Sequence, residues 1–392
     1  MPASPSTARV INDRTALELL QREGPLTAGQ LKTLTGLSRP TVADLVERLQ
    51  ESGLIRVVGE AGARRRGPNA RVYGIVADRA HLAALDVRTE GVSLVVADLL
   101  GATLAEAALP IARDSDPEPA VELTASLLER TVREAGAARL HSVGIGVPGL
   151  IDPVTGELRD ATGLPAWHRS LVAALQERLS ARIVLENETN LAAVAEQSTG
   201  AARDRDTFAF LWLGGGVGAA LFLDGRLRRG ASGGAGEIGF LPVPGTGGLP
   251  SASDCGGGFH SLTGSRAICA LAEEYGLKPP VPPETHRPPA AAIVAEAVAA
   301  GAEEFLDALA ARLSLGAAAL TAILDPGCVV LGGEVGLAGG AELASRVESA
   351  LAELTPLPTR VRPGELGGAA ILRGALLMAR DTAQEELFAP GA

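Results

Sequence analysis

Apolar positions near the N-terminus recur at helical spacing and then alternate as they do in strands. Residues 39–52 are expected to form a helix, and four of its apolar positions share one face: Val42, Leu45, Val46 and Leu49. Ser38 is the expected N-cap of this helix. A shorter helix before it begins at a capping box opened by Thr27 and ends at Gly36. Two strands follow, so residues 13–76 are predicted to form a winged helix-turn-helix.

The two predicted strands, at 54–58 and 71–75, flank a basic, glycine-rich tip. The tip carries three consecutive arginines: Arg64, Arg65 and Arg66. Such a wing is expected to lie against phosphates or to enter a minor groove. At the start of the longer helix, Ser38, Arg39 and Thr41 are of the types that reach base edges and phosphates in the major groove. We predict that these six residues bind double-stranded DNA; the alternative is a winged helix used only for dimerisation or protein contact.

The distribution of charge divides the chain at the same place. Residues 1–77 carry 11 Lys or Arg and 7 Asp or Glu, a net charge of +4. The whole chain has a formal net charge of −11, so residues 78–392 carry −15. An acidic protein repels DNA through its general field, and the basic N-terminal part is therefore the part that can dock. We predict a DNA-binding domain over 1–77 and a second domain over 78–392.

From about residue 80 the pattern changes to strands interleaved with helices. Strands are expected at 81–88, 92–99, 103–109, 141–147, 182–185, 208–213, 219–223 and 328–331. Helices are expected at 117–135, 167–179, 190–199, 262–275, 290–312 and 314–324, with a last helix from about 368. Glycines follow several strands directly, where backbone amides can approach a phosphate or sugar oxygen unobstructed. This order predicts an α/β fold of two lobes with a cleft between them.

Composition narrows the class of protein. Hydrophobic residues make up 46% of the chain and aromatic residues 3%, which predicts an aliphatic core with thin, closely packed helices. There is no run of 18 apolar residues and no signal-peptide segment at the N-terminus, so we expect a soluble, cytoplasmic protein without membrane contact. Cys255, Cys269 and Cys328 are too few and too scattered for a disulfide framework.

Five stretches together carry a resemblance to a known family: Val143–Gly149, Glu186–Asn190, Leu213–Gly218, Gly230–Gly239 and Asp325–Gly333. The run Gly230–Gly239 is the most specific of them. With these stretches the chain, from about residue 10 to 380, resembles the regulator branch of the ROK family (repressors, open reading frames, kinases). The resemblance implies a bilobal actin-like ATPase fold, association as a homodimer or homotetramer, and a sugar or sugar phosphate bound in the cleft.

Three departures from the kinases of that family argue against catalysis. Their first phosphate loop has two glycines after an aspartate, whereas Asp86 is followed by Val87, Arg88 and Thr89. Their second phosphate loop has a threonine where this chain has Gly215. Their catalytic aspartate aligns with Glu188, whose extra methylene displaces the carboxylate from the proton it would take. We therefore predict no kinase activity, no catalytic residue and no cofactor.

The zinc motif of the family is also incomplete. Phe240 stands in place of its histidine, and only Cys255 matches one of its three cysteines. A tetrahedral structural site needs four ligands. Cys255, His260 and Asp254 could form a degraded site, but a lone cysteine and histidine in a glycine-rich loop are more often packed or exposed. We predict no bound metal.

Asn187, Glu188 and Glu237 remain from the family's sugar site. Amides and carboxylates donate to and accept from paired hydroxyls, which is the chemistry of sugar recognition. We predict that these residues bind a sugar or sugar phosphate; the alternative is that Asn187 and Glu237 only hold loops. Trp167 lies in a segment that flanks the cleft in the family, where it either stacks on a ligand or has a core or lid-anchoring role.

The leading hypothesis is a DNA-binding transcriptional regulator, a repressor of carbohydrate-related genes whose inactive ROK domain dimerises and senses a small molecule. Because half-sites must lie about one helical turn apart, or a multiple, a pseudo-palindromic operator is expected. A signal would pass through residues 76–79, which join the two domains. Two alternatives stay open: a sugar kinase with a fused regulatory module, and an effector-independent regulator with a vestigial cleft.

Overall fold

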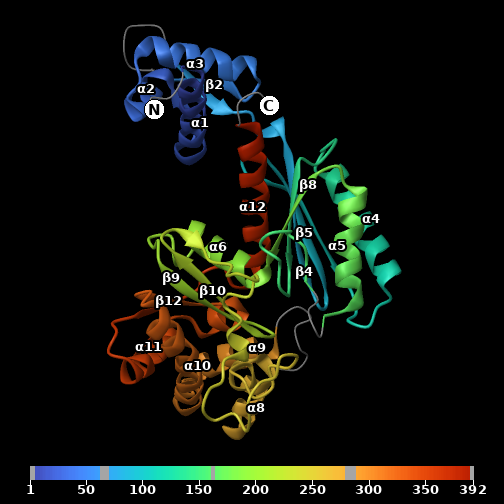
Figure 1. The fold of residues 1–392 in the computed structure, drawn as a ribbon, viewed down its shortest axis with the longest axis vertical. Helices are drawn as coiled ribbons and strands as arrows, with labels where there is room; N and C mark the ends of the chain where they lie inside the picture. Colours follow the sequence, from blue (N-terminus) through green and yellow to red (C-terminus); the bar gives the residue numbers. More distant parts are fainter. Residues whose placement is uncertain (1–4, 62–69, 160–163, 279–287, 389–392) are drawn as a thin grey trace.

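The structure, a computed structural model, describes residues 5–61, 70–159, 164–278 and 288–388. Its N-terminal module has three helices and a three-stranded sheet (Figure 1): α1 (Pro5–Glu23), β1 (Leu26–Thr27), α2 (Ala28–Thr35), α3 (Arg39–Glu51), β2 (Ile55–Ala61) and β3 (Ala70–Ile75). The strands are antiparallel in the order β1-β3-β2. The predicted winged helix-turn-helix is confirmed, and α1 and β1 were not predicted.

Caps define the ends of the two helices that the sequence predicts. The Thr27 hydroxyl accepts from the backbone N–H of Gln30, whose side chain accepts in turn from the N–H of Thr27. Gly36 ends α2 in the left-handed region, with φ of 71°. The Ser38 hydroxyl accepts from the N–H of Thr41 and opens α3. The four predicted apolar positions of α3 are buried, as expected for its inward face.

The rest of the chain forms two lobes, each built on a five-stranded sheet (Figure 1). The first sheet contains β4 (His81–Arg88), β5 (Gly91–Asp98), β6 (Thr103–Pro110), β7 (Ser142–Val147) and β8 (Arg182–Asn187). The second contains β9 (Phe208–Leu213), β10 (Val217–Leu223), β11 (Arg226–Leu227), β12 (Cys328–Gly332) and β13 (Arg360–Pro363). The orders β6-β5-β4-β7-β8 and β11-β10-β9-β12-β13 repeat one topology, three antiparallel strands followed by two parallel ones. The predicted bilobal α/β fold is confirmed.

Helices cover both faces of each sheet. The outer face of the first sheet packs against α4 (Pro117–Glu134) and α5 (Ala166–Arg178). The outer face of the second packs against α8 (Ser265–Glu274), α9 (Pro289–Ala300), α10 (Glu303–Leu324) and α11 (Gly333–Leu354). Between the lobes lie α6 (Glu188–Thr199) and α12 (Ala370–Leu387). The short α7 (His260–Thr263) precedes α8, so the single helix predicted at 262–275 is divided at Gly264.

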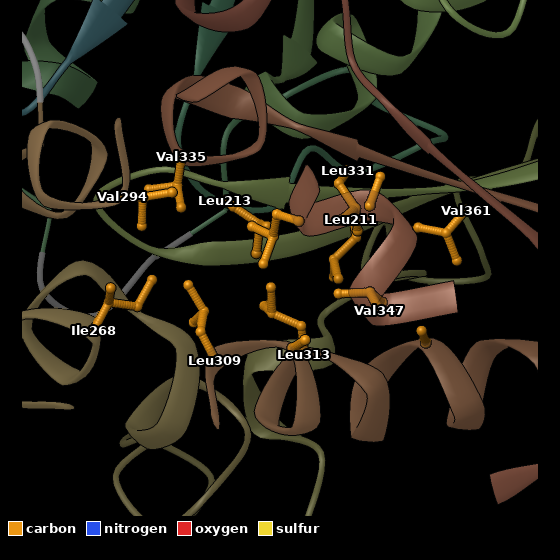
Figure 2. Close-up of a cluster of buried hydrophobic side chains, with 14 of the residues drawn as sticks. Leu211, Leu213, Ile268, Val294, Leu309, Leu313, Leu331, Val335, Val347 and Val361 are labelled. Carbon is orange, nitrogen blue, oxygen red and sulfur yellow. The ribbon is translucent and has the colours of Figure 1, made fainter. Parts of the chain in front are cut away.

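Successive side chains of the central strands point to opposite faces of the sheet and so join two different hydrophobic clusters. In β9, Leu211 and Leu213 belong to the outer cluster of the second lobe, whereas Phe210 and Trp212 belong to the cluster between the lobes. Figure 2 shows the outer cluster, in which the two leucines meet side chains from the covering helices: Ile268, Val294, Leu309, Leu313, Val335 and Val347. Because both faces of the strand are buried, its sequence is one continuous apolar run.

Glycines allow α6, α12 and β7 to approach closely between the lobes. A Cβ atom on Gly374 of α12 would lie 2.0 Å from the carbonyl oxygen of Leu191 in α6. A Cβ atom on Gly144 of β7 would lie 2.1 Å from the carbonyl oxygen of Ala375 in α12. No side chain fits at these distances, so the glycines set the spacing of the three elements.

The C-terminal end of α12 connects the lobes to the winged helix. Ala379, Ala383 and Phe388 are buried in the same hydrophobic cluster as the apolar side chains of α1 and α3. The Gln384 amide donates to the Gln21 side chain at 3.1 Å and to the carbonyl oxygen of Leu99 at 3.2 Å. The end of α12 lies beside the winged helix in Figure 1. Along the chain, residues 76–80 join β3 to β4, so two connections hold the winged helix on the first lobe.

The boundary predicted between two helices of the second lobe is wrong. The predicted helices at 290–312 and 314–324 are instead α9 and α10, which meet at Gly301. Gly301 ends α9 in the left-handed region, with φ of 65°. Ser314 lies inside α10, where its hydroxyl donates to the carbonyl oxygen of Ala311 rather than capping a new helix. An alanine-rich sequence offers no polar period that would have marked the true break.

The apolar helix α10 is long enough and hydrophobic enough to cross a membrane. Half of its most apolar window is buried inside the second lobe, where Leu309 and Leu313 join the outer cluster. A buried core helix has the same composition, so α10 is explained by packing.

Candidate functional sites

The start of α3 presents the side chains predicted to contact DNA. Ser38 and Arg39 are exposed and Thr41 is partly buried. The Ser38 and Thr41 hydroxyls lie 2.8 Å apart, so they bond to each other in addition to capping the helix. Among the described residues, no hydrogen-bond or ion-pair partner holds the Arg39 guanidinium. Arg39 is the one charged side chain among these three predicted residues, and its guanidinium is exposed.

The predicted wing arginines Arg64, Arg65 and Arg66 lie outside the described residues. The strands that lead to them carry two further exposed cations, Arg56 on β2 and Arg71 on β3. Neither was predicted, although a basic residue at a solvent-facing position of a wing strand is a signal that the sequence contains. Arg56 Nη1 lies 3.9 Å from Asp78 Oδ1, so its charge is partly balanced.

An ion pair anchors α3 to α1. The Arg48 Nη2 atom lies 2.6 Å from Asp13 Oδ1, and its Nε atom lies 3.2 Å from Asp13 Oδ2. The side chains are 28% and 23% exposed, so water only partly screens the pair. This fork-like contact, which was not predicted, fixes the orientation of α3 relative to α1.

Asn187 ends β8 and caps α6. Its Oδ1 atom accepts from the backbone N–H groups of Thr189, at 2.8 Å, and Asn190, at 3.3 Å. Its Nδ2 atom donates to the carbonyl oxygen of Gly149 at 2.9 Å. One amide hydrogen remains for a ligand, while the other contacts hold two loops together. That Asn187 binds a sugar stays a prediction.

Glu188 follows as the first residue of α6 and is largely surrounded by protein. Burial raises the pKa of its carboxyl to about 7; the charges of Asp86, Glu334 and Glu237 act in the same direction, and Arg88 acts against them. A carboxyl that titrates near neutral pH is protonated in some molecules, where it can donate a hydrogen bond, and ionised in the others, where it can only accept. Glu188 can therefore pair with a hydroxyl in either sense.

Glu237 lies in the glycine-rich loop that follows β11. Its side chain contacts solvent, yet surrounding protein desolvates the carboxyl and raises its pKa. Its charge acts on Glu188, so the two predicted carboxyls belong to one site. Among the described residues, no side-chain hydrogen bond engages Glu237, which leaves its carboxylate free to meet a ligand.

Arg88, at the end of β4, is held by groups from both lobes. Its Nε atom lies 2.8 Å from Asp86 Oδ2, and its Nη1 atom lies 2.5 Å from Glu334 Oε1. Its Nη2 atom donates to the carbonyl oxygen of Gly368 at 2.8 Å. Burial lowers the pKa of Arg88, but the two carboxylates raise it by more, so the guanidinium stays charged. Arg88, which stands in the first phosphate loop, is thus held in place by ion pairs.

The carboxylates that hold Arg88 are themselves buried. Asp86 is 4% exposed and Glu334 is 8% exposed. Burial raises the pKa of Asp86 although Arg88 lies beside it, and Asp86 Oδ1 has no hydrogen-bond partner. Glu334 was not predicted. It directly follows the two glycines at the end of β12, and glycines after strands were the sequence signal by which other candidate loops were recognised.

Comparison with known proteins agrees with this architecture. Residues 82–382 match the ROK family, and residues 12–66 match the MarR family. The chain belongs to the ROK family. The xylose repressor of Bacillus subtilis is 25% identical over 247 residues, which cover 62% of this chain and 62% of the repressor. The DNA-binding transcriptional dual regulator NagC of Escherichia coli is 25% identical over 245 residues, or 59% of this chain and 57% of NagC.

The chain therefore spans about three fifths of the length of these relatives. Solved structures extend the likeness of fold. A ROK family transcriptional regulator, a homologue of the E. coli MLC protein, superposes with a TM-score of 0.76 at 19% identity, over 97% of this chain and 98% of its own. A ROK hexokinase from Thermus thermophilus has a TM-score of 0.60 at 28% identity, over 77% of this chain and 99% of its own.

The loop that stands in place of the ROK zinc motif carries Asp254, Cys255 and His260. The Asp254 carboxylate accepts from the N–H of Gly256, and burial lowers the pKa of His260, which begins α7. Within the part of the chain that the structure describes, no three His, Cys, Asp or Glu side chains are arranged to hold a metal ion. The expectation of no bound metal stays a prediction, which elemental analysis of the purified protein tests.

Trp167 belongs to the core of the first lobe of this ROK fold. Its side chain is fully buried, and its ring meets the His168 ring edge-on with centroids 4.2 Å apart. Burial lowers the pKa of His168 to about 4, so the imidazole is neutral and its Nε2–H donates to the carbonyl oxygen of Arg88 at 3.0 Å. Of the two roles considered for Trp167, the structure shows the core role, and its neighbour positions the Arg88 backbone.

Proposed function

We propose that this chain is a DNA-binding transcriptional regulator, a repressor of carbohydrate-related genes. Residues 1–77 bind operator DNA, and residues 78–392 form a dimerising domain that senses a sugar and has no kinase activity. One observation carries the proposal: a winged helix with an exposed, basic start of α3 belongs to the same chain as a ROK domain whose first phosphate loop is filled by an ion-paired arginine. The relatives named as repressors support the same function.

The DNA contact is assigned to six residues. Ser38, Arg39 and Thr41 would meet the major groove, and Arg64, Arg65 and Arg66 would meet the backbone or the minor groove. A homodimer, or a homotetramer built from two such dimers, would place two reading heads on a pseudo-palindromic operator. The acidic remainder of the chain, with a net charge of −15, would keep the lobes away from the duplex.

Two residues support the proposal that the chain has no kinase activity. Arg88 engages the carboxylates of both Asp86 and Glu334, so its guanidinium is already paired and is not a free cation for a nucleotide phosphate. Glu188 is one methylene longer than the aspartate it replaces, so its carboxylate would be displaced from the proton that a catalytic base must take. Incubation of the purified protein with ATP and a panel of sugars should yield no sugar phosphate, and product formation would refute this part of the proposal.

The sugar site is assigned to Asn187, Glu188 and Glu237. The free carboxylate of Glu237 and the titrating carboxyl of Glu188 supply acceptors and a donor for adjacent hydroxyls. The engagement of Asn187 in capping favours the second candidate, an effector-independent regulator whose cleft is vestigial. Both candidates bind DNA, and they differ in whether a sugar stabilises the folded protein.

One experiment separates them. Thermal denaturation against neutral sugars, amino sugars and sugar phosphates finds a ligand by the rise it causes in Tm. Operator affinity is then followed by fluorescence anisotropy with and without that ligand, and the active ligand should weaken binding. Glu237→Ala should abolish the release, whereas Glu274→Ala, an exposed glutamate on α8, should preserve it. No Tm shift with any ligand, together with intact operator binding, would favour the vestigial cleft.

A signal from the sugar site has two routes to the DNA. One is the short connection through residues 76–80, and the other is α12, which passes between the lobes and ends in the winged helix cluster. A ligand shifts the arrangement of the lobes only by binding one arrangement more tightly than another. Any rotation of the lobes about α12 would move both connections and so the spacing of paired reading heads.

A further inference from the structure

Arg88, the last residue of β4, makes polar contacts with groups that lie outside the first lobe. Asp86 and Arg88 lie on β4 of the first lobe, and Glu334 lies in the first turn of α11 in the second. Gly368, whose carbonyl oxygen accepts from Arg88, lies in the short turn that leads from β13 to α12. One guanidinium therefore joins the first lobe, the second lobe and the start of the helix between them.

The geometry of this contact leaves little freedom to either lobe. The side chains of Arg88, Asp86 and Glu334 are 29%, 5% and 10% exposed. A Cβ atom on Gly214 would lie 3.0 Å from Glu334 Oε2, and one on Gly368 would lie 2.7 Å from Glu334 Oε1. The Glu334 carboxylate thus lies between the loop that follows β9 and the turn before α12, and a side chain at Gly214 or Gly368 would crowd it.

Charge gives the contact its strength. A buried carboxylate is strongly disfavoured unless a counter-ion and hydrogen bonds compensate its desolvation. Arg88 is the cation that acts on both Asp86 and Glu334, and removal of its charge leaves two buried carboxylates facing each other across the boundary between the lobes. Separation of the lobes would relieve that repulsion.

We propose that Arg88 is a latch between the lobes: its ion pairs set the separation of the two lobes without nucleotide. The latch adjoins the assigned sugar site, because Asp86, Arg88 and Glu334 all act on the charge of Glu188. If a sugar bound at that site changes the arrangement of the lobes, it must therefore distort or break the ion pairs of Arg88. This statement rests on the proposed function. A separate ion pair, Arg229–Glu186 at 2.5 Å, joins the loop after β11 to β8.

The test measures the distance between the lobes in the protein without DNA or sugar. Spin labels are placed at Leu123→Cys on α4 and Ile323→Cys on α10, which are 55% and 78% exposed, after Cys255→Ser and Cys269→Ser. Labelled chains are diluted into unlabelled protein so that electron–electron resonance reports distances within one chain. With Arg88 intact we expect one narrow distance peak.

Two variants break the latch in different ways. Arg88→Met removes the charge and keeps the apolar stem, and Glu334→Gln removes one carboxylate charge at constant shape. Each should shift the peak to longer distance and broaden it. Arg346→Met is the matched control, because Arg346 also bridges two carboxylates, Asp307 and Glu342, but within the second lobe. It should leave the peak unchanged.

An unchanged peak in Glu334→Gln and in Arg88→Met would overturn the proposal. If Arg88→Met fails to fold, Glu334→Gln decides alone, since it keeps the shape of the side chain while it removes the charge and one acceptor oxygen. The measurement contains no sugar and no operator, so its result does not depend on the proposed function. If the protein binds DNA and responds to a sugar but neither substitution changes the distance between the lobes, the latch is refuted and the proposed function is not.

Discussion

Replacement of Glu188 by Gln should stabilise the protein, and more so as the pH rises. The carboxyl has an ordinary pKa of 4.5 in an unfolded chain and a pKa of about 7 in the fold, chiefly because burial disfavours its charged form. The native state therefore holds this proton more tightly than the unfolded state does. Its contribution to stability is fully present below pH 4.5 and is lost as the pH rises through 7.

The magnitude follows from the two pKa values. At 1.36 kcal/mol per pKa unit, the difference between 4.5 and about 7 corresponds to about 3 kcal/mol. Glutamine cannot ionise, so the Glu188→Gln variant does not lose this stability. Its free energy of unfolding should exceed that of the wild-type protein by about 3 kcal/mol at pH 8 and equal it near pH 4.5. Because Asp86 titrates next to Glu188 and also has a raised pKa, the gain belongs to the pair of carboxyls.

The assay is urea unfolding followed by circular dichroism between pH 4.5 and 8.5 at one protein concentration. Glu274→Gln, on the exposed face of α8, is the control and should follow the wild-type curve at every pH. Parallel loss of stability in wild type and Glu188→Gln across this range would show that Glu188 is ionised in the native state at neutral pH. In that case the carboxyl could not serve as a hydrogen-bond donor to a sugar.

Three further predictions address the DNA contact and the packing between the lobes. Arg39→Ala should weaken operator binding by about 1–3 kcal/mol in fluorescence anisotropy and relax preference at one base pair; equal loss on unrelated DNA would show a phosphate contact instead. Joint replacement of Arg64–Arg66 by Ala should weaken all sequences alike and flatten the dependence of log K on log salt, and an unchanged slope would contradict a wing–phosphate contact. Gly374→Ala should destabilise the fold by at least about 1–3 kcal/mol in urea unfolding, because the new methyl would meet the Leu191 carbonyl at 2.0 Å; wild-type stability would mean that α6 and α12 can separate freely.

Features determined by neighbours in sequence could be predicted from the sequence. The caps at Thr27 and Ser38 and the turn at Gly36 act within a few residues, and the buried positions of α3 follow from its period. The strands of both sheets follow from apolar runs bounded by glycines, as in Phe208–Leu213. Uniform composition hid the break at Gly301, because alanine-rich helices on both sides of it have the same pattern.

Features determined by distant pairs could not be predicted. Arg88 was recognised as foreign to a phosphate loop, but Glu334 lies 246 positions away, and no local pattern links the two. The raised pKa of Glu188 depends on burial and on charges from three other segments, which composition does not reveal. Asn187 was recognised by its motif, yet its engagement with Gly149 depends on a strand end that only the folded sheet brings near.

The burial of the end of α12 beside the winged helix has a consequence for the order in which the protein is made. Domains generally fold as they leave the ribosome, beginning at the N-terminus. Here Ala379, Ala383 and Phe388, which join the hydrophobic cluster of the N-terminal module, are translated only after both lobes. A nascent or prematurely terminated chain therefore lacks part of that cluster, and the winged helix reaches its final packing only when translation has reached the end of α12.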